Sequence, residues 1–146
     1  MALQLIALFC EDIREEVSGQ HTLVGILPDI IDLPPAPAGT NENARPRLPK
    51  LAVYFRFHFG VDDAAHPINI KLRFASGHET SVGTIDKDLV QKAQQEAKEA
   101  KIPMAGLRFT AVYQSFRIES FGVMSALAEV GGEQYSAGVL NFRVVA

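Results

Sequence analysis

The four histidines are the first residues to consider for chemistry, because an imidazole can bind a metal ion or transfer a proton near neutral pH. They are His21, His58, His66 and His78. Their positions lack the regular spacing of metal ligands, and the pair His78-Glu79 lacks the second histidine that a zinc-binding helix carries one turn later. We therefore expect these side chains to have surface or capping roles.

The single cysteine is the only thiol that the chain offers as a nucleophile. Cys10 is followed by Glu11 and Asp12, and negative charges beside a thiol raise its pKa and so reduce the thiolate fraction. The glycine-rich motifs that bind phosphates or dinucleotides are absent from the sequence, and so is the serine motif of the α/β-hydrolases. We expect Cys10 to be a buried structural residue, and we expect neither a catalytic residue nor a cofactor.

Acidic residues gather in four segments, 11–19, 60–66, 86–88 and 131–134. Together these segments carry nine acidic and two basic residues. If each strand of a sandwich crosses it once, the four segments lie at one end, where oxygen-rich loops can hold Ca²⁺. The candidate metal ligands are then Glu11, Asp12, Asp62 and Asp63. The alternative is a group of solvated loops whose charge keeps the protein in solution.

Composition limits the classes of function. The chain has 146 residues, 47% of them hydrophobic, which suits one globular domain over residues 1–146. Lysine and arginine number 14 against 17 acidic residues, so we do not expect a nucleic-acid binder, which needs a clustered positive surface. No apolar run reaches the roughly 18 residues of a membrane span, and the start lacks the features of a signal peptide. We therefore expect a cytoplasmic protein that does not bind a membrane.

Alternation of apolar and polar residues predicts β-strands along most of the chain. Residues 50–59 place Leu51, Val53, Phe55, Phe57 and Phe59 on one face, and residues 67–75 show the same period. Further strands are expected over 3–10, 20–27, 79–85, 106–116, 120–130 and 138–145. About seven or eight strands predict a mainly all-β fold, an immunoglobulin-like β-sandwich.

Two segments depart from the strand pattern. Residues 86–101 are rich in alanine, glutamine, lysine and glutamate, which predicts one helix. Residues 32–49 contain five of the eight prolines, which predicts an extended loop that connects two strands.

The two strongest strand patterns are separated only by residues 60–66, which predicts a hairpin. Matching their apolar faces pairs Phe59 with Ile68, Phe57 with Ile70 and Phe55 with Leu72. The outer face of that hairpin then carries Tyr54, Arg56, His58, Lys71 and Arg73. Such a surface suits the docking of an acidic protein patch or an anionic ligand, because arginine offers forked donors. The alternative is a solvated surface without a partner.

Three short motifs carry a resemblance. The motif Phe-Cys-Glu-Asp-Ile-Arg at residues 9–14 is followed by Leu-Val-Gly-Ile at 23–26 and Leu-Pro-Lys-Leu at 48–51. In these motifs the chain resembles an uncharacterised bacterial family, also met in phage-related genomes, that has no assigned activity. The resemblance implies a sandwich fold and transfers no catalytic residue.

Three functions follow from these observations. The sequence favours a non-catalytic binding module whose partner is a protein, and self-association into a homo-oligomer is left open. The first alternative is a binder of a small anionic ligand or nucleotide. The second is a small metal-dependent hydrolase built from the acidic end and His66.

Overall fold

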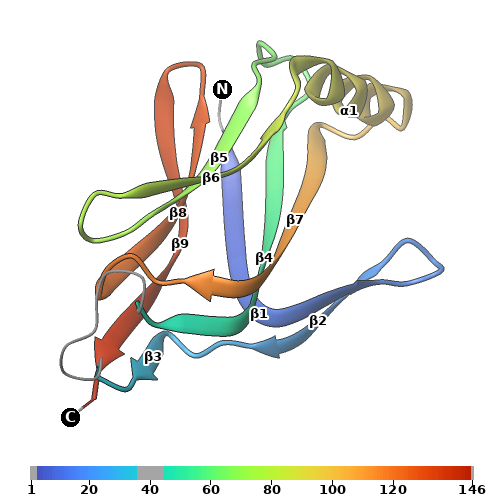
Figure 1. Cartoon of the computed structure of the whole chain (residues 1–146). Coiled ribbons are helices and arrows are strands. Elements are labelled where there is room, and N and C mark those ends of the chain that lie inside the picture. Colours follow the sequence, from blue (N-terminus) through green and yellow to red (C-terminus); the bar gives the residue numbers. More distant parts are fainter. Residues whose placement is uncertain (1–2, 36–44, 146) are drawn as a thin grey trace.

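Two β-sheets stacked face to face form the body of the computed structural model, which is described here for residues 3–35 and 45–145 (Figure 1). Alternating sequences of the kind noted above form strands because one side of each pleat can be buried and the other solvated. The elements are β1 (Gln4–Glu15), β2 (His21–Ile26), β3 (Ile30–Leu33), β4 (Arg47–Gly60), β5 (Ile68–Arg73), β6 (Glu79–Ile85), α1 (Lys87–Glu99), β7 (Met104–Arg117), β8 (Gly122–Val130) and β9 (Glu133–Val144).

The strand order confirms the predicted sandwich. A four-stranded sheet has the order β2-β1-β4-β7, and a five-stranded sheet has the order β3-β9-β8-β5-β6. The pairs β4–β7, β5–β8 and β8–β9 are antiparallel, whereas β3 pairs with β9 in parallel. The helix α1 follows β6 in the chain, where the sequence predicts it.

The core lies where the alternation in β4 predicts it. Leu51, Val53, Phe55, Phe57 and Phe59 are all fully buried. The rings of Phe55 and Phe57 stack at a centroid distance of 6.1 Å and an interplanar angle of 9°. The face of β4 opposite these residues is therefore the outer face of the four-stranded sheet.

The predicted hairpin between residues 50–59 and 67–75 is wrong. The strand β4 pairs with β1 and β7, whereas β5 pairs with β6 and β8 in the other sheet. The connecting segment 60–66 crosses from one sheet to the other. Both strands have a fully apolar inner face, and two such faces can meet across the core, about 10 Å apart, as well as side by side. Alternation fixes which side of a strand is buried, and it leaves the neighbour undetermined.

The prediction that all four acidic segments share one end is also wrong. In the pairing of β1 with β4, Gln4 lies opposite His58, so the loop after Gly60 lies near the start of β1 and segment 11–19 lies at its far end. The remaining three segments do meet, since Ile68 pairs with both Ile85 and Val130. The assumption of one crossing per strand fails at β2, which pairs only with residues 10–15 of β1 and does not return to the start of that strand.

The proline-rich segment is shorter than the predicted loop over 32–49. The strand β3 extends through Leu33 and pairs in parallel with β9, and β4 begins at Arg47. The carbonyl of Pro46 accepts a hydrogen bond of 2.9 Å from the amide of Ile118. Residues 36–44 lie outside the described residues. In the described part of the chain, no helix has the length and apolar character that crossing a membrane requires.

Candidate functional site

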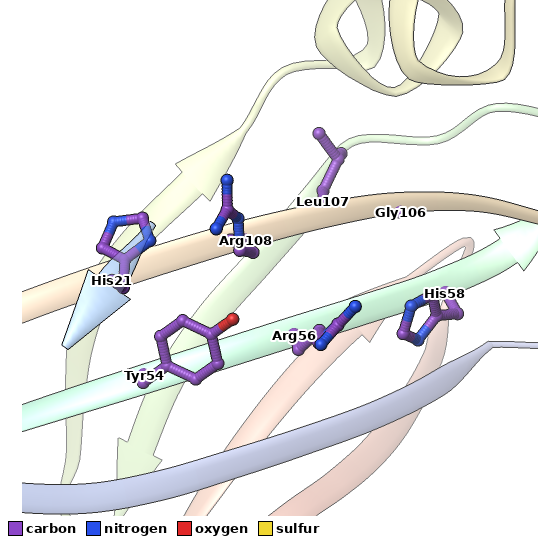
Figure 2. Close-up of a pocket in the computed structure, with 7 residues that line it drawn as sticks. All are labelled: His21, Tyr54, Arg56, His58, Gly106, Leu107 and Arg108. Atoms are coloured by element: carbon purple, nitrogen blue, oxygen red, sulfur yellow. The ribbon is translucent and has the colours of Figure 1, made fainter. Parts of the chain in front are cut away.

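A cavity of about 470 Å³ lies on the outer face of the four-stranded sheet. Figure 2 shows the residues that line it, which are His21, Tyr54, Arg56, His58, Gly106, Leu107 and Arg108. Three of them were predicted as binding residues, namely Tyr54, Arg56 and His58. They project from the outer face of β4 because they alternate with the buried phenylalanines of the same strand.

The register between β4 and β7 brings two arginines together. Arg56 pairs directly with Arg108, and His58 pairs with Gly106. Both arginines are exposed. Within the described chain, neither forms an ion pair with a carboxylate. Like charges directly opposite each other on adjacent strands are unfavourable, so this pair concentrates positive charge that the described residues do not neutralise.

The glycine in β7 makes room for the cavity. A Cβ atom placed on Gly106 would lie 3.4 Å from Cδ2 of His58, an ordinary van der Waals contact. Any larger side chain at this position would extend over the neighbouring strand and fill the space beside the two arginines. The absence of a side chain there keeps the floor of the cavity open.

The turn between β1 and β2 reaches the cavity from the side. The rings of His21 and Tyr54 are 5.9 Å apart, tilted by 59°. An Nη2 of Arg108 donates to the carbonyl of Gly19 at 3.5 Å, at the long end of hydrogen-bond distances. Nδ1 of His21 is buried and has no hydrogen-bond partner among the described residues. The tip of this hairpin therefore forms one wall of the cavity.

The other two predicted binding residues lie on the opposite sheet and are paired with carboxylates. The ammonium of Lys71 lies 2.7 Å from Glu129 and 3.5 Å from Glu79. Arg73 binds Glu79 at 2.8 Å. The hydrogen bond with Glu129 raises the pKa of Lys71, and the hydrogen bond from Arg73 lowers the pKa of Glu79. The predicted basic face is thus divided between two sheets, and its half on β5 is neutralised.

The structure does not bring the four predicted metal ligands together. Glu11 and Asp12 lie in β1, and Asp62 and Asp63 lie in the loop after β4. Asp12 binds Lys50 at 2.9 Å, and this hydrogen bond lowers the pKa of its carboxyl group. In residues 3–35 and 45–145, no group of three or more histidine, cysteine, aspartate or glutamate side chains is arranged to hold a metal ion.

The two acids of the second pair have structural roles in their own loop. The carboxylate of Asp63 accepts a hydrogen bond of 2.9 Å from the amide of Gly60. Asp62 lies 3.4 Å from the ammonium of Lys98 on α1. The nearby side chain of Gln94 donates to the carbonyls of Gly60 and Asp63 at 3.1 and 2.8 Å. These contacts fix the loop after β4 against the helix.

The cysteine is buried, as the sequence predicts. Cys10 has no exposed surface, and its thiol lies 3.7 Å from the carbonyl of Ala52 as a weak donor. Burial raises the pKa of the thiol, and the charge of Asp12 raises it further. The thiol is therefore protonated and closed off from solvent at neutral pH.

Sequence reasoning missed His21 and Arg108 as members of the cavity. The alternating pattern of the predicted strand places Arg108 at an outward position and so indicates that its side chain is exposed. The sequence does not indicate that its neighbour on the adjacent strand is Arg56. His21 was expected to have a surface or capping role, but it is the first residue of β2, and the hairpin brings its ring to Tyr54. Comparison with known proteins adds no further assignment, since neither a protein-family model nor a curated protein matches the chain.

Proposed function

We propose that this protein is a non-enzymatic binding module that holds an acidic group of a protein partner in the cavity between β4, β7 and the β1–β2 turn. The observation that carries the proposal is the pairing of Arg56 with Arg108 without a carboxylate among the described residues. Two guanidinium groups side by side offer forked donors to a carboxylate or phosphate, and an incoming anion would relieve their mutual repulsion.

The surroundings of the cavity favour a protein as the partner. On β1, Ile6 pairs with Arg56 and Leu8 pairs with Tyr54. These two aliphatic side chains are 55% and 37% exposed on the same face. Apolar residues at the centre with charged residues beside them are typical of protein–protein interfaces. A partner could cover the aliphatic side chains while one of its acidic groups enters the cavity.

A small anionic ligand is the second candidate. It is favoured by the recess at Gly106 and by the rings of Tyr54 and His21, which could stack on a nucleobase. Small-molecule sites are usually lined mainly by apolar groups. Here Leu107 is the one aliphatic residue among those that line the cavity, and its side chain packs against the hydrophobic core. The hydrolase hypothesis has no comparable support, since its four acids lie apart.

The experiment is a titration of the isotope-labelled protein, followed by NMR, with three separate probes: a hexaglutamate peptide, inorganic phosphate and ATP. We expect hexaglutamate to shift the side-chain signals of Arg56 and Arg108, with an affinity that falls as salt is added. The double variant Arg56→Glu, Arg108→Glu should bind the peptide at least about tenfold more weakly, the equivalent of about 1.4 kcal/mol.

The control is the double variant Lys87→Glu, Lys92→Glu, which makes the same change in net charge on α1. It should bind hexaglutamate as the unmodified protein does. If the arginine variant folds and still binds the peptide with unchanged affinity, the cavity is not the site and the proposal is wrong. Binding of ATP without binding of hexaglutamate would select the small-ligand candidate instead.

A further inference from the structure

We infer that the partner contributes an extended strand that adds to the free edge of β7 and places an acidic side chain against Arg108. This inference rests on the proposed function and specifies how the partner binds. In the four-stranded sheet, β7 is the last strand and β4 is its neighbour (Figure 1). With 14 residues, Met104–Arg117, it shares with β4 the greatest length among the described strands.

Edge strands normally carry features that prevent further pairing, such as prolines, lysines, bulges or short length. The other edge strands are shorter or irregular: β2 has six residues and β3 has four, and β6 pairs with β5 through an irregular register. The strand β7 has no proline and no lysine. Its regular part ends near Ser115, whose φ is +51°, and α1 packs near its start. The residues in between, about 106–114, form a long exposed edge.

The described contacts leave the backbone of this edge available. Between Ala105 and Phe116, no backbone–backbone hydrogen bond joins β7 to a described residue other than through its ladder with β4. The guanidinium of Arg47 donates to the carbonyl of Ser115 at 2.8 Å, just beyond the exposed edge. The β1–β2 turn reaches β7 through the side chain of Arg108, not through its backbone. An extended chain could therefore pair with the outward amides and carbonyls of β7, the mode of recognition called β-strand addition.

Charge decides what kind of strand fits. The sequence of β7 contains two arginines and no acidic residue. Antiparallel pairing of β7 with β7 of a second copy, centred on Thr110, would place Arg108 opposite Val112 and leave its charge without an acid. An acidic strand is the complement. A glutamate directly opposite Arg108 would have its Cβ about 5 Å away on the same face, within reach of the guanidinium.

The outward positions of β7 also specify the flanking residues of the partner. Arg108, Thr110 and Val112 follow one another at alternate positions, and Val112 is 46% exposed. An antiparallel partner strand would meet these three side chains in reverse order. The expected pattern is an apolar β-branched residue, then a small polar residue, then a glutamate, with one residue between each.

The test uses an acetylated and amidated heptapeptide with the sequence Thr-Val-Thr-Thr-Thr-Glu-Thr. Its binding is measured by NMR titration at low salt, beside a peptide with glutamine in place of the glutamate. We expect the glutamate peptide to bind at least about tenfold more tightly. The variant Arg108→Gln should abolish that difference between the peptides, whereas Lys92→Gln on α1 should preserve it.

Two N-methylated peptides test the strand addition itself. One is methylated on the backbone at its second, fourth and sixth residues, the other at its third and fifth. Alternate amides of an added strand face β7, so only one of the two modified peptides should lose binding.

If both methylated peptides bind as the parent peptide does, or if the parent peptide does not bind at millimolar concentration, the strand-addition inference is wrong. The proposed function would then still be judged by the hexaglutamate titration. If the glutamate and glutamine peptides bind with equal affinity and Arg108→Gln does not change the binding of either, the proposed function fails as well.

Discussion

Gly138 in β9 lies directly against the backbone of β1, which belongs to the opposite sheet. A Cβ atom on Gly138 would lie 2.9 Å from the carbonyl oxygen of Ala7 in β1. Ordinary contacts begin at 3.4 Å, so the substitution Gly138→Ala requires the two strands to separate by about 0.5 Å. The obstacle is a backbone atom in a paired strand, which cannot rotate away as a side chain can.

The size of the effect follows from two opposing contributions. Overpacking of a well-packed interior costs about 1–3 kcal/mol. Replacing glycine by alanine reduces the freedom of the unfolded chain and returns about 0.4–1 kcal/mol. We therefore expect Gly138→Ala to lower the free energy of unfolding by roughly 1–2 kcal/mol. The chain has no tryptophan, so unfolding in urea is best followed by far-ultraviolet circular dichroism. With a slope of about 2 kcal/mol per molar urea, the midpoint should fall by roughly 0.5–1 M.

The matched control is Gly106→Ala, also a glycine in a strand but with ordinary contact at 3.4 Å from His58. It should leave the urea midpoint unchanged or raise it slightly. Equal midpoints for the two variants would refute the reasoning, because the only difference we invoke between them is the backbone contact at Gly138.

Three further predictions concern the core, the pH dependence and the cavity. Phe57→Ala should cost about 3–5 kcal/mol in urea unfolding, because the ring is fully buried; a loss below about 1 kcal/mol would be incompatible with its place in the core. The hydrogen bond from Lys50 lowers the pKa of Asp12 in the folded state. The ionised carboxylate therefore stabilises the fold above the ordinary aspartate pKa, and this stabilisation is lost as the pH falls through the pKa that Asp12 has in the folded protein. Acid unfolding of Asp12→Asn should therefore show a weaker pH dependence than the unmodified protein in this range. Arg108→Gln should raise the melting temperature at low salt by removing repulsion with Arg56, and the gain should disappear at high salt.

The burial of each strand could be predicted from the sequence because it depends on a local pattern. Phe55 and Phe57 occupy alternate positions in a strand, and any fold that uses that strand must bury the same face. The partner of a strand depends on residues far away in the chain. Nothing in residues 50–75 distinguishes a hairpin from a crossing between sheets, and this is why Tyr54 and Lys71 were placed on one face when they lie on two.

The charge state of a surface is equally non-local. Lys71 and Arg73 are paired because β6 and β8 bring Glu79 and Glu129 to them. Arg56 has no such pair because its neighbour in β7 is another arginine. Both cases look alike in the sequence, where each basic residue alternates with apolar ones. Only the register of the strands determines whether a basic side chain lies beside a carboxylate or keeps its charge without one.

This contrast is the reason to assign the cavity a function. At several other strand positions an acid lies beside an exposed basic residue, as Asp32 does for Arg143 and Asp12 for Lys50. Arg47 also faces an arginine, Arg117, but there Glu119 binds Arg117. At the cavity the same fold sets Arg56 against Arg108, with no carboxylate among its described lining residues. Natural proteins tend to break the rule that like charges avoid each other at their functional sites. The missing acid is then the group that we expect the partner to supply.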